Sequence, residues 1–163
     1  MKKIILSLLV AVVSLSVFAQ DKQTAVIKAG TVITLEAIEE VRGAKANPGQ
    51  SVDFKVQRDV IVDGVVAIPA GTLAKGTVYE AKRSTVFGTR GRLGIKLRYL
   101  ITQAGEYVNF TGSEVYIKGK NYTAGSVVLF CFTLLPLPCG SKAVMPIGYE
   151  VEATVASNTQ VTL

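Results

Sequence analysis

Side chains that commonly carry out chemistry in proteins are scarce in this chain of 163 residues. It contains no histidine, which removes the most common general base, the usual partner of a nucleophilic serine or cysteine, and the commonest metal ligand. Two carboxylate pairs remain, Glu39 with Glu40 and Glu150 with Glu152. Glu150 and Glu152 fall on one strand face and could act as acid and base or bind a hard cation. No further ligands lie near them in sequence, so we interpret them as solvated and predict no enzyme, metal site or cofactor.

Glycines and cations gather between residues 82 and 98. The glycines from Gly88 to Gly94 loosely match a phosphate-binding loop, but such loops precede a helix, and here an alternating strand follows. A hairpin turn explains them. We predict either solvated charges that protect a strand edge or a site for anionic glycan or lipid headgroups, and no nucleic acid binding, because aromatic residues for base stacking are sparse. The six cations, with no acidic residue among them, are Lys82, Arg83, Arg90, Arg92, Lys96 and Arg98.

An uncharged run without alternation extends from Ser126 to Pro138. It is shorter than the roughly 20 residues that a membrane-spanning helix needs. It fits either a strand or loop buried in the core, or an exposed element that contacts a membrane surface or a partner protein. Cys131 and Cys139 could form a local disulfide or remain two buried thiols. The predicted contact residues of the exposed alternative are Val127, Val128, Leu129, Phe130, Phe132, Leu134, Leu135 and Leu137.

The N-terminus has the pattern of a signal peptide. Lys2 and Lys3 precede an apolar segment, and Val17-Phe18-Ala19 supplies small residues where a signal peptidase cleaves. The alternative, a retained anchor, is disfavoured because the segment is shorter than a membrane span. We predict a cleaved signal peptide at residues 1–19 and one domain at 20–163, with the apolar insertion at about 126–138. Removal of the two lysines lowers the net charge of +6 by two.

Alternating apolar and polar residues indicate β-strands. Asp63-Gly64 between two valine-rich runs predicts a tight type I′ hairpin. The sequence therefore predicts an all-β fold, a single small barrel or sandwich of short, mostly antiparallel strands, since closure removes free edges. The predicted inward faces are Val52, Phe54 and Val56; Leu93, Ile95, Leu97 and Tyr99; and Tyr149, Val151, Ala153 and Val155.

Several pieces, read in order, resemble the C-terminal β-barrel of the TrbI-type conjugation proteins, which are outer-membrane core-complex subunits of type IV secretion systems. Here the barrel would be a stand-alone exported domain, similar to those found in Bacteroidetes-like envelopes. The chain departs from the family pattern at two points. It has no tryptophan, and Asn158 stands where the family usually has an aspartate. The pieces are Ala29-Gly30-Thr31-Val32-Ile33, Ile68-Pro69-Ala70-Gly71-Thr72-Leu73, Gly91-Arg92-Leu93 through Leu100, Gly105 to Gly112, and Pro146-Ile147-Gly148 through Val155.

The resemblance implies a related fold and a ring-forming or envelope-docking habit. In that family a long insertion before the last strands reaches the outer membrane, and Ser113 to Gly140 occupies its place here. We therefore expect a non-enzymatic cell-envelope protein, in the periplasm or associated with the outer membrane. It would assemble with itself or with an outer-membrane partner through Ser126 to Pro138. The alternative is a periplasmic binding module for anionic glycan or lipid headgroups.

Overall fold

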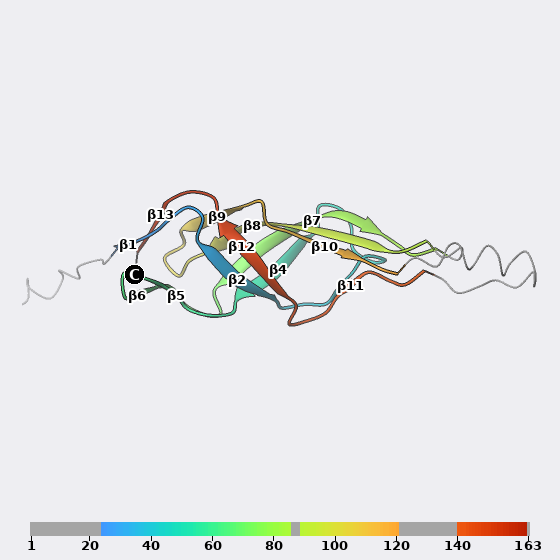
Figure 1. The fold of residues 1–163 in the computed structure, drawn as a ribbon, viewed down its shortest axis with the longest axis horizontal. Helices are drawn as coiled ribbons and strands as arrows, with labels where there is room; N and C mark the ends of the chain where they lie inside the picture. The colour runs from blue at the N-terminus through green and yellow to red at the C-terminus, as the bar shows by residue number, and fades with distance from the viewer. Residues whose placement is uncertain (1–23, 86–88, 121–139, 163) are drawn as a thin grey trace, which may run out of the picture.

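A computed structural model describes residues 24–85, 89–120 and 140–162 of the chain. The regular elements in these ranges are all β-strands (Figure 1). Their bounds are β1 Thr24–Ile27, β2 Val32–Ala37, β3 Val41–Arg42, β4 Ser51–Val56, β5 Val60–Val62, β6 Val65–Ile68, β7 Leu73–Lys82, β8 Arg92–Ile101, β9 Tyr107–Thr111, β10 Glu114–Lys118, β11 Val144–Met145, β12 Glu150–Val155 and β13 Thr159–Thr162.

A closed antiparallel barrel forms the body of the molecule, and 6 strands build it. Around the barrel the order is β2, β4, β7, β8, β9 and β12, and β12 pairs again with β2. The order around the barrel is thus the order along the chain, with the other strands inserted between. The predicted all-β fold of short antiparallel strands is confirmed, and of the two forms considered the protein adopts the barrel.

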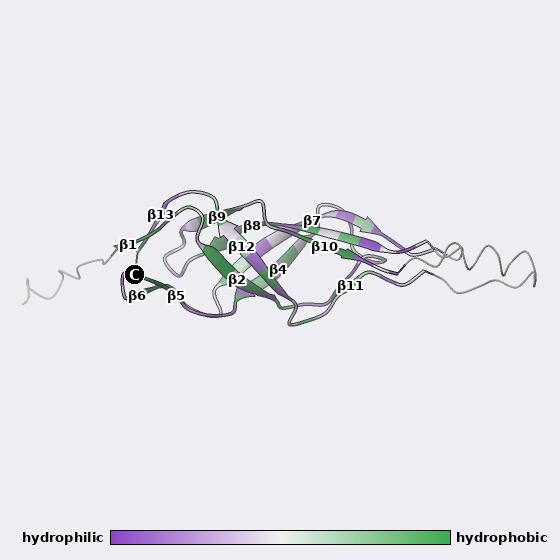
Figure 2. Ribbon diagram, viewed as in Figure 1, coloured by the Kyte–Doolittle hydropathy of each residue, from purple (hydrophilic) through white to green (hydrophobic). Residues whose placement is uncertain are grey.

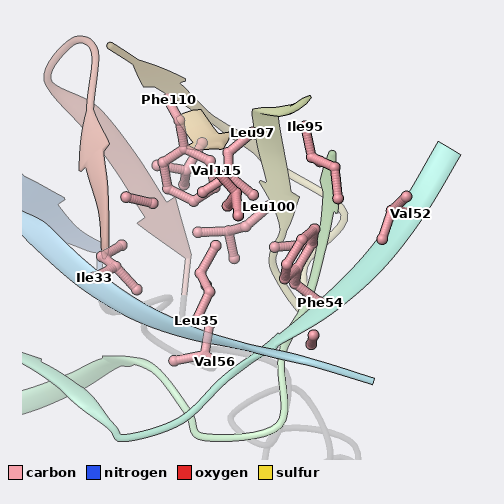
Figure 3. Close-up of a cluster of buried hydrophobic side chains, with 14 of the residues drawn as sticks. Ile33, Leu35, Val52, Phe54, Val56, Ile95, Leu97, Leu100, Phe110 and Val115 are labelled. Atoms are coloured by element: carbon pink, nitrogen blue, oxygen red, sulfur yellow. The ribbon is translucent and has the colours of Figure 1, made fainter. Parts of the chain in front are cut away.

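Apolar side chains fill the interior of the barrel. On β4 the alternating Val52, Phe54 and Val56 are fully buried, as predicted. Residues from the other barrel strands meet them, among them Leu35 and Leu100 (Figure 3). The hydropathy of the strands alternates between apolar and polar along the barrel (Figure 2), because successive side chains of a strand point to opposite faces. Removal of this apolar surface from water stabilises the barrel.

Two β-bulges interrupt the pairing of β7 with β8. The first changes which residues of β8 face the core. Lys75 pairs with Tyr99 and Gly76 pairs with Leu97, which leaves Arg98 as the extra residue of β8. A bulge shifts the alternation by one residue. As a result Leu97 and Leu100 are buried, whereas Tyr99 is partly exposed. The prediction that Tyr99 shares the inward face of Leu93, Ile95 and Leu97 is therefore wrong.

The second bulge lies at Tyr79, between the pairs Val78 with Ile95 and Glu80 with Gly94. Tyr79 is 45% exposed. Its ring lies directly over Gly94, since a Cβ added at Gly94 would stand 2.5 Å from the Cζ atom of Tyr79. Residue 94 must therefore be a glycine for this ring to lie against the sheet.

The Asp63-Gly64 hairpin is confirmed. Val62 pairs with Val65 across it, and both turn residues have positive φ angles, 50° at Asp63 and 84° at Gly64. Two positive φ angles are the mark of a type I′ turn. The strands of this hairpin, β5 and β6, lie beside β1 at the end of the molecule that carries the C-terminus (Figure 1).

Several predictions fall on residues outside the described ranges. They are the signal peptide at residues 1–19, the apolar run from Ser126 to Pro138, and the two cysteines. These predictions and the boundaries of the domain remain predictions. Among the residues that the structure describes, no helix has the length and apolar character needed to cross a membrane.

Candidate functional site

A three-stranded extension of the barrel sheet, which we call the arm, is the most distinctive feature of the fold. It consists of residues 78–82 of β7, residues 92–96 of β8, and β10. β8 serves both parts of the molecule, because its residues 99–101 pair with β9 in the barrel and its residues 92–96 pair with β10 in the arm. In Figure 1 the arm leaves the barrel opposite the end formed by β1, β5, β6 and β13.

The fork between barrel and arm lies at Gly112 and Ser113, where the chain passes from β9 to β10. Gly112 adopts a positive φ of 64°, which a glycine reaches without strain. The Ser113 side chain is buried and accepts a hydrogen bond at 2.8 Å from the Thr154 amide of β12. Its hydroxyl also donates to the Thr111 carbonyl at 3.1 Å. The Ser113 side chain therefore bonds to two barrel strands, β9 and β12, at the point where the chain leaves the barrel for the arm.

One face of the arm is packed against a second, smaller layer. This layer consists of β3 and β11, which pair with each other. Val41 and Met145 of the layer and Ile95 and Val115 of the arm are buried members of the same apolar core. The layer approaches closely at Gly91, where an added Cβ would lie 2.8 Å from the Ala143 amide nitrogen. The opposite face of the arm is open to solvent.

The chain leaves and re-enters the described structure at the end of the arm. The Gly119 amide donates to the Gly91 carbonyl at 3.0 Å, and the Gly91 amide donates to the Ser141 carbonyl at 3.1 Å. The Ser141 amide donates to the Lys120 carbonyl at 3.2 Å. A Cβ at Gly119 would lie 2.0 Å from the Ser141 carbonyl oxygen, so the two stems meet backbone to backbone. The segment between Lys120 and Gly140, which contains the apolar run, is therefore attached at the end of the arm.

The solvent face of the arm carries a small network around Glu80. The Tyr116 hydroxyl donates to Glu80 at 2.9 Å, and Lys82 and Arg92 approach its carboxylate at 3.7 and 3.6 Å. The hydrogen bond from Tyr116, followed by the two cations, holds the pKa of Glu80 below its usual value. The same hydrogen bond raises the pKa of Tyr116. Lys118 lies over the Tyr116 ring, 4.7 Å from its centre.

The six predicted cations are not gathered in one place. Lys82 of β7 stands opposite Arg92 of β8 in the strand register of the arm, and both side chains approach Glu80. Arg98 lies at the barrel bulge, roughly 20 Å further along β8 by the rise of a strand. Lys96, between them, faces Glu114 of β10 at 4.0 Å. Neighbouring strands thus supply acidic partners that the local sequence lacks, and the whole set does not form one anion site.

A pocket near the end of the arm has a cationic rim that the sequence did not indicate. Its volume is about 650 Å³. Glu40 pairs with Arg42, and this hydrogen bond lowers the pKa of Glu40. Within the described part of the chain, no carboxylate other than Glu40 lies in ion-pair range of the cations of the rim. The rim is Arg42, Lys45, Arg83 and Lys142, of which Arg83 alone belongs to the predicted set. Arg42 and Lys45 are close in sequence, but Arg83 and Lys142 belong to distant segments, and tertiary packing brings the three segments together.

The carboxylates Glu150 and Glu152 lie on the outer surface of the barrel, where β12 pairs with β2. The Gln57 side chain donates to Glu150. Glu36 stands directly opposite Glu150 and has Lys55 at 3.4 Å. In the ranges that the structure describes, no three acidic or cysteine side chains gather as metal ligands. The interpretation of these glutamates as solvated strand residues agrees with their positions.

No protein-family model matches the sequence, and no curated protein matches it. Among solved structures, the chain is similar to ComB10 of the Com type IV secretion system of Helicobacter pylori, with 15% identity and a TM-score of 0.44. The match covers 82% of this chain and 88% of that chain. ComB10 is described as part of a type IV secretion system, and the proteins that the sequence motifs resemble also belong to type IV secretion systems. A likeness this distant carries no argument about function, which must come from the residues of this chain.

Proposed function

We propose that this protein is a non-enzymatic component of the bacterial cell envelope, attached to the outer membrane through the apolar run from Ser126 to Pro138. The observation that carries the proposal is the pinning of the two stems, Gly119-Lys120 and Gly140-Ser141, to Gly91 and Thr85 at the end of the arm. The described residues that flank the uncharged segment thus lie at the end of the arm, outside the barrel. A segment whose two flanks are held there suits attachment better than catalysis.

The residues beside the stems support a membrane surface as the partner. Lys120 lies in one stem and Lys142 follows the other, while Arg90 precedes Gly91 in the chain. Cations that flank an apolar segment are attracted by anionic headgroups, while the apolar residues enter the boundary between headgroups and acyl chains. The arm end combines both properties.

The barrel itself supports an attachment role over a reaction. Its interior is filled by buried side chains such as Phe54 and Leu35 (Figure 3), so a substrate has no room there. The sequence has no histidine. The glutamates Glu150 and Glu152, which formed the strongest catalytic candidate, lie on the open surface of a strand.

Flotation with lipid vesicles tests the attachment. The purified chain starting at Gln20 contains every described residue and is mixed with vesicles of phosphatidylcholine, with or without phosphatidylglycerol. We expect the protein to float with the anionic vesicles and to be released by salt, because exposed charge contacts are screened. Phe130→Asp with Phe132→Asp should abolish flotation.

The matched control places two aspartates at exposed isoleucines away from the arm, Ile61→Asp with Ile147→Asp. These side chains are 64% and 67% exposed, and their replacement should leave flotation unchanged. Equal loss in both double variants would contradict the proposal, because it would show general apolar adsorption. Association with whole envelopes but not with either vesicle would also overturn it, in favour of a protein partner.

A further inference from the structure

The free edge of β10 is the surface that supports a further inference. β10 pairs with β8 along one edge, with Glu114 opposite Lys96 and Lys118 opposite Arg92. Within the described residues, its other edge has no strand beside it. An edge strand with unpaired amides and carbonyls is a template for pairing with another chain.

The hydrogen-bond pattern shows which residues of β10 are available. In an antiparallel pair, residues that exchange hydrogen bonds alternate with residues that do not. Leu97 donates to Ser113, and Gly119 donates to Gly91, both at 3.0 Å. These two bonds place odd-numbered residues of β10, Val115 and Ile117, in the hydrogen-bonded pairs with β8. The backbone groups of the even-numbered residues therefore point to the free edge.

The even-numbered residues of this short strand are Glu114, Tyr116 and Lys118, an acid, an aromatic and a base with even spacing. An antiparallel copy of the strand can be laid against it with Tyr116 opposite Tyr116. This register brings Glu114 of each copy opposite Lys118 of the other, and it matches free amides to free carbonyls at all three positions. On the other face of the sheet, Val115 lies opposite Ile117 of the second copy.

We propose that two copies of this protein pair through β10 in this twofold register, which joins their arms into one continuous sheet. Opposite charges directly across an antiparallel pair are stabilising, and like charges there are destabilising. A shift by two residues in one direction would set Glu114 opposite Tyr116 and lose both charge pairs. A shift in the other direction would set Glu114 opposite Lys120, whose backbone amide and carbonyl already bond to Ser141. The charges therefore select the register, and the backbone provides the hydrogen bonds.

This inference deepens the proposed function by naming a second copy as a partner, and it rests on that function for its role in envelope assembly. The two proposals concern different residues, because β10 ends at Lys118, before the apolar run begins. Variants of β10 leave residues 126–138 intact. Loss of vesicle flotation and loss of dimers can therefore be observed independently.

Charge reversal tests the register. Sedimentation velocity of the chain from Gln20, over a series of concentrations, should show a reversible dimer. Glu114→Lys and Lys118→Glu should each weaken dimerisation by roughly tenfold or more, because two symmetric pairs become repulsive. The double variant Glu114→Lys with Lys118→Glu should restore the dimer, since each new lysine again faces a glutamate.

The rescue separates contacts between copies from contacts within one chain. Glu114 also approaches Lys96 within its own chain, at 4.0 Å, so Glu114→Lys alone could perturb the arm. Lys118 stands four positions away from Glu114 on the same strand, roughly 13 Å along it. Lys118→Glu cannot repair a contact within the chain at that distance, so a restored dimer identifies the contact between copies.

Covalent trapping provides a second readout. In a background of Cys131→Ser and Cys139→Ser, Tyr116→Cys places one thiol from each copy at the twofold axis, at a Cα separation of about 5.5 Å that a disulfide can bridge. Oxidation should yield a cross-linked dimer. Lys96→Cys, on the same face but inside the sheet, should not cross-link. A chain that stays monomeric at all concentrations, charge reversals without effect, or equal cross-linking at both positions would overturn the proposal.

Discussion

Replacement of Ser113 by alanine tests whether the fork between barrel and arm depends on one hydroxyl group. The Ser113 Oγ accepts from the Thr154 amide at 2.8 Å and donates to the Thr111 carbonyl at 3.1 Å. Alanine removes both hydrogen bonds and introduces no new bulk. The Thr154 amide, which points toward the fork, then has no partner from residue 113.

The expected loss follows from burial of the site. Ser113 is 7% exposed, so water has little access to the amide that the substitution leaves behind. A buried donor without a partner costs about 1–3 kcal/mol, which is more than the net contribution of an ordinary hydrogen bond. We expect Ser113→Ala to lower the free energy of unfolding by this amount. The corresponding fall in Tm is about 2–4 °C per kcal/mol for a chain of this size.

Urea unfolding monitored by circular dichroism measures the change. The midpoint should shift with an unchanged slope, because the same surface is exposed on unfolding. The matched control is Thr159→Ala, whose exposed hydroxyl donates to the Ser157 carbonyl at 3.1 Å. Loss of an exposed hydroxyl should change stability by no more than about 0.5 kcal/mol.

Amide hydrogen exchange gives a local readout at the same site. Ser113→Ala should accelerate exchange of the Thr154 amide more than that of amides in the opposite half of the barrel. A loss of stability no larger than that of Thr159→Ala, together with unchanged exchange at Thr154, would refute the reasoning that Ser113 joins the two parts.

Two further predictions concern the solvent face of the arm. Gly94→Ala should cost about 1–3 kcal/mol, because its Cβ would lie 2.5 Å from the Tyr79 ring and displace it; in urea titrations, adding Tyr79→Ala should recover most of this loss, and simple additivity would contradict the contact. Glu80→Gln should reduce the acid sensitivity of folding. The lowered pKa of Glu80 gives stability that is present above the unfolded value of 4.5 and is lost as pH falls through the folded value. If the free energy of unfolding of wild type and variant changed in parallel from neutral pH to below about pH 4, Glu80 would not have this role.

The arm gives the two proposals a common geometry. Its end holds the stems of the apolar run, and its edge presents β10. Pairing of two antiparallel copies would point the two arm ends in opposite directions. The end of the arm and the edge of β10 would then serve different contacts in an assembly, and both belong to the arm.

Local sequence patterns determined the strands and the composition of the core. Alternation identified the buried face of β4, with Val52, Phe54 and Val56, because a strand directs every second side chain to the same side. The Asp63-Gly64 pair identified its hairpin, since few residues other than glycine, asparagine and aspartate tolerate positive φ. These signals act over a few residues and need no tertiary contact.

The tertiary structure decided what depends on pairing between distant segments. The bulge at Arg98 turned Tyr99 outward, and the register of β8 against β10 set Lys96 beside Glu114. The sequence alone could predict neither, because a shift of one residue in register exchanges the faces of a whole strand. The fork at Ser113 and the arm that begins there also depend on pairing between distant strands. They exist because β9 pairs with β8 and β12 to close the barrel.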